Sequence, residues 1–483
     1  MRLAVVQRIT GLLMIIFSVT MLPPMAVSLY FHDGALHAFQ QGFGITLMTG
    51  FIIWFPARKH TQELRLRDGF LIVAAFWFGL GSVGALPFLF MEAPSMSLTD
   101  AMFESMSGLT TTGATVLTGL DYLPQSLLFY RQQLQWLGGM GIVVLAVAVL
   151  PMLGVGGMQL YRAEIAGPVK DTKLTPRITE TAKALWYIYL GLTIACGAAY
   201  YYAGMSLFDA ICHSFSTVAI GGFSTHDASI GFFDSRLINS IATVFMFIAG
   251  INFSLHFLAI RSGKLSNYLA DSEFRTYASG LAGLSVAVVA YLYLAGEYST
   301  IEAAVSEGLF QAVSIATTTG FTTTDYSAWP GALPVVLIFA SFVGGCAGST
   351  GGGIKVMRVL LLYRQGVREI KRLVHPNAEV PVKLGGQTVS PRVIESVWGF
   401  FAVYVVVFAI MMVILLADGI DQVTAFSAIA ASLNNLGPGL GDVATGFGSL
   451  SNLSKWVCVI AMLLGRLEIF TVLVLVSRTF WRD

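Results

Sequence analysis

Charged residues are scarce in this chain of 483 residues. Asp, Glu, Lys and Arg make up 11% of it, against about 25% in soluble globular domains. Hydrophobic residues make up 55%, and the mean hydropathy is +0.74. So few charges cannot cover the surface of a water-soluble protein of this size, which excludes an ordinary soluble enzyme and a disordered chain. The composition indicates a polytopic membrane protein.

Cysteine and catalytic motifs are also sparse. The four cysteines are far apart and form no Cys-x-x-Cys pair, so we interpret them as small apolar residues and expect no disulfide or metal cluster. No His-Glu-x-x-His motif occurs, and the apolar segments hold no paired carboxylates or Ser–His set. We therefore expect a protein that is not an enzyme and has no organic cofactor. The net charge of +1 gives no indication of nucleic-acid binding.

Long apolar segments are abundant instead. Ten of them are long enough to cross about 30 Å of hydrocarbon, at roughly 9–31, 38–56, 69–90, 131–153, 183–203, 236–260, 278–296, 332–363, 393–416 and 456–477. The first resembles a signal peptide in its charge, but it has no clear small-residue cleavage site, so we interpret it as a true span.

The basic residues lie almost entirely between alternate spans. Of the 28 Lys and Arg residues, 24 fall on one side of the predicted membrane, and the longest basic segment is about 355–392. The outer side carries only Arg131, Arg236 and Lys455. The positive-inside rule then places both termini in the cytoplasm, as an even number of spans also does.

Four segments on the opposite side match one another. Residues 100–115 read DAMFESMSGLTTTGAT, 209–224 read DAICHSFSTVAIGGFS, 307–322 read EGLFQAVSIATTTGFT and 424–439 read TAFSAIAASLNNLGPG. They align on Gly113, Gly222, Gly320 and Gly437, which we name the anchor glycines, and we name the segments around them the anchor loops. Four copies in register indicate an internal repeat. The alternative is that they are ordinary extracellular loops rich in Thr and Gly.

Each repeat is predicted to be a span, a short helix, an anchor loop and a second span. Ser97, Ser206 and Ser299 are plausible N-caps for the first three short helices, and Asp421 is a weaker one for the fourth. Such a helix covers about 20 Å, so its loop ends near mid-membrane, where backbone must be buried in protein or line water. Four helix C-termini around one axis would favour a cation, and loop carbonyls would replace its hydration shell.

The predicted fold is therefore an all-α membrane protein. Four span–pore helix–filter loop–span units surround a pseudo-fourfold pore, after two extra transmembrane helices. The predicted divisions are 1–68 for the two extra helices, and 69–160, 161–262, 263–375 and 376–483 for the four repeats.

This pattern resembles the superfamily of K⁺ transporters that includes Trk, Ktr and HKT proteins, over essentially the whole chain. The two extra N-terminal spans are similar to the TrkH branch rather than KtrB. The resemblance implies K⁺ uptake across the bacterial cytoplasmic (inner) membrane by a homodimer with one pore in each subunit. It also implies a cytosolic nucleotide-binding regulatory subunit resembling TrkA.

The resemblance also implies a selectivity filter whose carbonyls hold K⁺. It falls on Thr111, Thr112, Gly113, Ile220, Gly221, Gly222, Thr318, Thr319, Gly320, Asn435, Leu436 and Gly437. Glycine at position 113 favours K⁺ over Na⁺, because a serine there accompanies Na⁺ transport in plant relatives. The fourth loop departs from the others at Asn434, Asn435 and Pro438, so we expect looser selectivity than in a symmetric channel.

Residues 344–353, the glycine-rich loop, interrupt the eighth apolar segment. They are Gly344, Gly345, Cys346, Ala347, Gly348, Ser349, Thr350, Gly351, Gly352 and Gly353. Glycine is about 1 kcal/mol less favourable than alanine in a helix, so we expect a break here and a movable loop beneath the filter. The alternative is a small-residue packing face. The resemblance implies that this segment is an intramembrane gate.

Arg466 lies inside the last apolar segment. A charge at that depth costs at least about 2.5–3.5 kcal/mol unless it faces water or a partner. An ion pair with Glu468 is the alternative, but residues i and i+2 face different sides of a helix. We expect Arg466 to face the pore as an electrostatic barrier, and the resemblance places an arginine there.

Two functions remain open. One is a gated, channel-like K⁺ conduit, and the other is a coupled K⁺/H⁺ or K⁺/Na⁺ symporter with the same filter. Coupled carriers usually hold further ionisable residues deep in their spans, and only Arg466 and Glu468 are clear examples here, which favours the conduit. The basic segment 355–392 satisfies the positive-inside rule, and it is also a candidate surface for the regulator and for anionic lipid.

Overall fold

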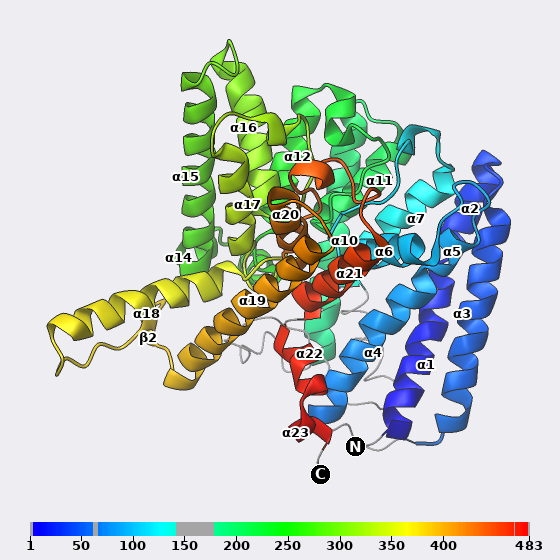
Figure 1. Ribbon diagram of the computed structural model, residues 1–483, viewed down its shortest axis with the longest axis horizontal. Coiled ribbons are helices and arrows are strands. Elements are labelled where there is room, and N and C mark those ends of the chain that lie inside the picture. Colours follow the sequence, from blue (N-terminus) through cyan, green and yellow to red (C-terminus); the bar gives the residue numbers. More distant parts are fainter. Residues whose placement is uncertain (1–2, 61–65, 142–177, 468, 482–483) are drawn as a thin grey trace.

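The protein is built almost entirely of helices. The computed structural model describes the chain apart from residues 1–2, 61–65, 142–177, 468 and 482–483. Within the described residues the only sheet is a short antiparallel hairpin of β1 (Lys383–Leu384) and β2 (Gln387–Thr388). The start of α1 and the end of α23 lie at the same end of the molecule (Figure 1).

The first helices pack side by side at one edge of the molecule (Figure 1). They are α1 (Leu3–Val19), α2 (Leu22–Phe31), α3 (Leu36–Ala57), α4 (Leu66–Gly84) and α5 (Leu86–Leu89). α1 packs along α3 and α4. Gly11 and Gly50 allow the close approach of α1 and α3, because a Cβ on Gly11 would lie 2.8 Å from the Gly50 carbonyl oxygen.

Six helical segments of the described chain are long and apolar enough to cross a membrane, or seven if one bent pair is counted. They run over Leu3–Phe31, Leu36–Ala57, Arg67–Leu89, Ala182–Tyr202, Ser272–Leu294 and Pro391–Ala417. Each coincides with a predicted span, and the last three belong to α10 (Ile178–Tyr202), α15 (Ser272–Leu294) and α19 (Pro391–Ala417).

The remaining predicted spans are the four that follow the anchor loops, and the second and third of them are divided. In the first, α7 (Gln125–Trp136) runs into the π-helical turn η2 (Leu137–Gly141), and residues 142–153 of the expected span lie outside the described residues. In the third, α17 (Leu333–Val343) and α18 (Val356–Val374) are separated by the glycine-rich loop, where the glycine content predicts a break. In the fourth, the chain forms α21 (Asn452–Leu467), α22 (Ile469–Val476) and α23 (Arg478–Trp481).

The predicted span at 236–260 is sharply bent. α12 (Arg236–Ala249) and α13 (Phe253–Ser262) meet at 92°. Asn252 N-caps α13 by accepting a hydrogen bond from the Ser254 amide at 2.8 Å, which starts a new helix within an apolar segment. A short helix, α14 (Ser266–Ala270), then leads into α15.

Four helices precede the anchor loops: α6 (Leu98–Leu109), α11 (Leu207–Val218), α16 (Ile301–Ala316) and α20 (Gln422–Leu433). Ser97, Ser206 and Asp421 cap three of them as predicted. For α16 the cap is Thr300, not Ser299, since the Thr300 hydroxyl accepts from the Ala303 amide. Each of these helices is buried along the part that leads into its loop.

The four short helices form a closed ring of contacts. Each packs against the span before it and the helix after its own loop, and also against one helix of a neighbouring repeat. These neighbouring pairs are α7 with α11, α12 with α16, α17 with α20, and α21 with α6. The last pair joins the end of the chain to its first repeat.

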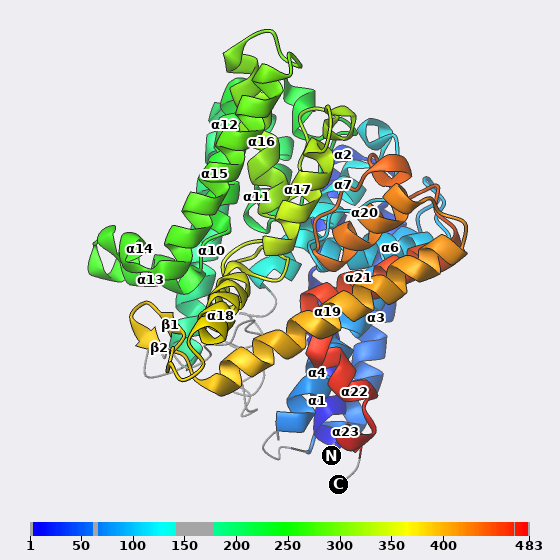
Figure 2. The ribbon, with the colours of Figure 1, turned by 60° about the vertical axis from the view of Figure 1, so that its left-hand side comes forward.

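α18 and the first turns of α19 project from the body of the molecule (Figure 1). The β-hairpin connects them in the chain and lies beside both (Figure 2). A small apolar cluster at their base includes Leu361, Val382, Ile394 and Val397. This projection carries most of the basic segment identified in the sequence.

Candidate functional site

The four anchor loops share one backbone conformation. The anchor glycines all have left-handed φ angles, of 82°, 77°, 81° and 101° in chain order. Two positions earlier, Thr111, Ile220, Thr318 and Asn435 are also left-handed, with φ of 56°, 53°, 70° and 54°. For β-branched residues this conformation is a genuine outlier, and such strain gathers at functional sites.

A matching hydrogen bond closes each loop onto its helix. The amide of the residue before each anchor glycine donates to a carbonyl near the end of the preceding helix, at 2.8–2.9 Å. The pairs are Thr112 to Ser107, Gly221 to Ser216, Thr319 to Ser314 and Leu436 to Ala431. The repeat seen in the sequence therefore has a counterpart in backbone geometry, including the divergent fourth copy.

The anchor glycines face one another's loops in cyclic order. A Cβ on Gly113 would overlap the Gly221 carbonyl oxygen, and the same holds for Gly222 with Thr319 and for Gly320 with Leu436. A Cβ on Gly437 would lie 2.8 Å from the Thr112 carbonyl oxygen, which closes the circle. The four anchor loops thus contact one another in cyclic order.

The fourth loop uses its asparagines to join the ring. The Asn435 amide group donates to the Thr112 hydroxyl of the first loop at 2.9 Å and to the Met462 carbonyl at 3.0 Å. Asn434 donates to the Ser341 hydroxyl at 3.0 Å and accepts from the Tyr404 hydroxyl. The departure from the Thr-rich pattern is therefore compensated by contacts that the sequence did not indicate.

Arg131 and Glu104 form a buried ion pair behind the first loop. The Arg131 Nε and Glu104 Oε1 atoms are 2.7 Å apart, and the two side chains are 1% and 0% exposed. Arg131 also donates to the Ser224 carbonyl and the Thr115 hydroxyl, both at 3.1 Å. It thereby links the first and second anchor loops.

Two glutamines of α7 hold the second anchor loop from behind. Gln132 donates to the Phe223 carbonyl at 3.0 Å, and Gln135 donates to the Gly221 carbonyl at 2.5 Å. Gln135 also accepts from the Phe223 amide at 3.1 Å. The sequence analysis did not single out these two residues, and it assigned Arg131 only to the outer face. A cluster of polar residues in the apolar segment after the first loop is the signal that could have found them.

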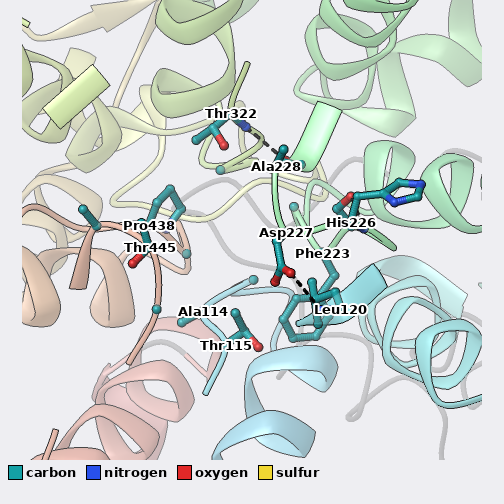
Figure 3. A pocket seen from close by; sticks show the side chains of 18 of the residues that line it. Ala114, Thr115, Leu120, Phe223, His226, Asp227, Ala228, Thr322, Pro438 and Thr445 are labelled. Carbon is teal, nitrogen blue, oxygen red and sulfur yellow. Dashed lines mark hydrogen bonds between the residues drawn. The ribbon is translucent and has the colours of Figure 1, made fainter. Parts of the chain in front are cut away.

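A cavity of about 330 Å³ opens on the side of the ring formed by residues that follow the anchor glycines. All four anchor loops line it, including Ala114, Phe223, Thr322 and Pro438 (Figure 3). Asp227 spans two loops here, because its carboxylate accepts from the Leu120 amide at 3.0 Å.

Beside this cavity, His226 lies between two carboxylates. Its ring is hydrogen-bonded to Asp121 at 2.5 Å and lies 3.5 Å from Asp209. Although burial opposes the charged form, these two carboxylates raise the pKa of His226 above its ordinary value. This cluster joins the first and second repeats at the mouth of the cavity.

The glycine-rich loop lies on the opposite side of the ring, against the residues that precede the anchor glycines. The Thr350 hydroxyl donates to the Val218 carbonyl at 2.9 Å, at the end of α11. The Gly352 amide donates to the Thr318 hydroxyl at 2.7 Å, and the Gly353 amide to the Asn434 carbonyl at 3.0 Å. The loop is therefore bonded to three of the four repeats.

Arg466, in the last turn of α21, reaches this loop. Its guanidinium donates to the carbonyls of Thr350 at 3.2 Å, Gly138 at 2.7 Å and Gly139 at 2.9 Å. Arg466 thus connects the fourth repeat to the glycine-rich loop and to the first repeat. The alternative partner, Glu468, lies outside the described residues.

No group of three or more His, Cys, Asp or Glu side chains that could hold a metal ion occurs in the described part of the chain. The four cysteines, Cys196, Cys212, Cys346 and Cys458, are buried and free.

Comparison with known proteins accounts for the whole chain. Residues 35–482 match the family model TrkH, described as a cation transport protein. The chain is 59% identical to the Trk system potassium uptake protein TrkH of Vibrio parahaemolyticus over 99% of both chains. It is 55% identical to the protein of that name from Escherichia coli K12 over 100% of both. The crystal structure of the potassium transporter TrkH from Vibrio parahaemolyticus superimposes with a TM-score of 0.91 at 55% identity, covering 100% of each chain. The chain belongs to the TrkH family of cation transport proteins.

Proposed function

We propose that this protein takes up K⁺ through a gated, channel-like pore whose filter is the ring of four anchor loops. The observation that carries the proposal is the cyclic facing of anchor glycines and carbonyls. The carbonyls of Thr112, Gly221, Thr319 and Leu436 each lie against the anchor glycine of a neighbouring loop, which supports a single ring of carbonyl ligands. The relatives named as potassium uptake proteins make K⁺ the expected ion.

The selection step follows from the chemistry of the ring. Backbone carbonyls replace the water ligands of an entering cation, as in other K⁺ filters. The four short helices end at the ring, so their C-terminal partial negative charges add to the attraction. The cavity above the ring gives a hydrated ion access to the first carbonyls.

The glycine-rich loop is the proposed gate. While it is bonded to Val218, Thr318 and Asn434, it covers the inner end of the ring. Arg466 adds a positive charge at the same level and holds the loop through Thr350. Conduction therefore requires the loop to leave these contacts.

The charge distribution supports insertion in the bacterial cytoplasmic membrane with both termini in the cytoplasm. The name of the relatives' Trk system supports partner subunits, and we infer a homodimer and a cytosolic nucleotide-binding regulator resembling TrkA. The projecting α18 carries basic side chains suited to the regulator or to anionic lipid.

Electrical recording from the purified protein in bilayers tests this function. A channel-like pore predicts unitary currents whose reversal potential follows the K⁺ gradient, shifts with the Na⁺ gradient only as far as Na⁺ permeates the filter, and does not respond to the H⁺ gradient. A reversal potential that shifts with the H⁺ or Na⁺ gradient at fixed stoichiometry would instead establish the coupled symporter.

A further inference from the structure

Glu273 touches the glycine-rich loop at a place that the proposed gate does not use. It lies in the first turn of α15 and is 3% exposed. One of its oxygens, Oε1, accepts hydrogen bonds from the Ala347 amide at 2.7 Å and from the Met357 amide at 3.1 Å. Ala347 is within the loop, and Met357 is in the first turn of α18.

The second of these bonds caps a helix from outside. The first amides of a helix have no partner within it, and Lys355 at the N-cap position of α18 provides no side-chain cap. A carboxylate near a helix N-terminus also interacts favourably with the helix dipole. Glu273 therefore satisfies the start of α18 and holds the middle of the loop with the same atom.

Through its Oε1 atom, Glu273 connects the glycine-rich loop to α18, and the surrounding contacts fix its position. On the same side, the loop is bonded to the bend between α12 and α13, because Cys346 donates to Gly250 and Gly348 accepts from Phe253, at 2.9 and 3.0 Å. Asp271, two residues before Glu273, caps its own helix through the Phe274 amide at 2.7 Å. The start of α15 is thus fixed, and α18 contacts the loop in two ways: through the shared Glu273 Oε1, and through the Val356 amide, which donates to the Gly345 carbonyl at 3.1 Å.

We propose that Glu273 is a positioning residue that holds the glycine-rich loop in its contacts with the ring and couples the loop to α18. A displacement of α18 is transmitted to Ala347 through the shared oxygen, so a regulator acting on α18 reaches the gate by this route. The inference rests on the proposed gating role of the loop.

Two substitutions test the length and the charge of the Glu273 side chain separately. Glu273→Gln keeps an oxygen at the same distance and removes the charge, and Glu273→Asp keeps the charge but is one methylene shorter. Asp271→Asn is the matched control, because that carboxylate bonds only to its own helix. In liposomes without a partner protein, we expect Glu273→Asp to raise Rb⁺ uptake about tenfold. The Gln and Asn variants should stay within about twofold of wild type.

Cys346 provides a readout that does not depend on ion flow. Its thiol is in the loop and is 1% exposed. Movement of the loop away from the ring should expose the Cys346 thiol. The rate of its modification by a water-soluble thiol reagent, followed by mass spectrometry, should therefore be about tenfold higher in Glu273→Asp than in wild type or Glu273→Gln.

Each result bears on the proposal. A monodisperse Glu273→Asp variant with wild-type uptake and labelling would overturn it, as would equal increases in the Asp and Gln variants. If deleting residues 345–352 leaves uptake unchanged, the loop is not the gate, yet faster labelling in Glu273→Asp alone still supports the positioning role. If the deletion raises uptake and Glu273→Asp changes neither readout, only the role of Glu273 fails.

Discussion

At the scale of single residues, each anchor loop combines a left-handed glycine with a second left-handed residue two positions earlier. The anchor glycines were predicted because they recur in register, and their left-handed φ angles explain why glycine stands there. The strained Thr111, Ile220 and Thr318 were not predicted to be strained, since nothing in a Thr or Ile marks a left-handed backbone. Their strain, of order 1–3 kcal/mol each, becomes visible only when the loop is seen closed onto its helix.

Gly113→Ser should lower the ratio of K⁺ to Na⁺ flux. The serine Cβ would overlap the Gly221 carbonyl oxygen and displace it from the ring. This overlap, rather than the left-handed φ that Gly119 shares, should weaken the discrimination between the two ions, and a loss of about 1.4 kcal/mol would lower the flux ratio about tenfold. Gly119→Ser is the control in liposome flux assays, because Gly119 has a φ of 69° and no atom within 4 Å of an added Cβ. Equal flux ratios in both variants would remove Gly113 from the filter.

Arg131 shows a second limit of sequence reading. Charge counting placed it on the outer face, whereas it is buried against Glu104, because burial depends on the packing of α6 against α7. Removing one member of a buried pair leaves an uncompensated charge, at a cost of about 3–5 kcal/mol. We expect Arg131→Met alone to lower the thermal unfolding temperature strongly. Arg131→Met with Glu104→Gln should recover much of the loss, and a double variant no more stable than the single one would contradict this account.

At the scale of elements, the spans before the anchor loops could be predicted, but the bend in the span after the second anchor loop could not. Hydropathy measures composition, and residues 236–260 are apolar whether the chain runs straight or turns by 92°. The break at 344–353 was predictable because six glycines there oppose a helix. The contacts of this loop with three repeats and with Glu273 could not be predicted, because they involve segments distant in sequence.

Deleting residues 345–352 should raise basal K⁺ flux without a partner protein. The deletion removes the bonds from Thr350 and Gly352 to the inner end of the ring. We expect an increase of about tenfold or more, equivalent to lowering a barrier by about 1.4 kcal/mol, in flux measured per monodisperse protein. A folded deletion variant that stays closed would show that the glycines serve packing only.

Arg466 has two roles that substitution can separate. A positive charge near a permeating cation costs between about 1 and 4 kcal/mol at 4 Å, and its planar fork also ties together Thr350, Gly138 and Gly139. Arg466→Ala removes both and should raise flux about tenfold. Arg466→Lys keeps the positive charge but lacks the planar guanidinium. If this variant has near wild-type flux, electrostatic repulsion keeps the pore closed. If its flux equals that of Arg466→Ala, the hydrogen bonds keep it closed. A well-folded Ala variant with wild-type flux would exclude both roles.

At the scale of the whole molecule, the ring closes because each repeat supports the next. The contacts of α7, α12, α17 and α21 with the following short helix run in the same order as the glycine–carbonyl contacts. The repeat itself was visible in the sequence, but the order of the loops around the ring was not, since matching copies carry no information on their neighbours. The boundaries assigned to the repeats stay predictions.

The central claim is that the four anchor loops form one cation site, and anomalous scattering tests it most directly. Crystals of the full chain grown with Tl⁺ or Rb⁺ should show an anomalous peak on the axis between the carbonyl oxygens of Thr112, Gly221, Thr319 and Leu436, weakened when K⁺ replaces the heavier ion. A map of the same crystals with no peak inside the ring, or with peaks only at carboxylate groups elsewhere, would contradict the account.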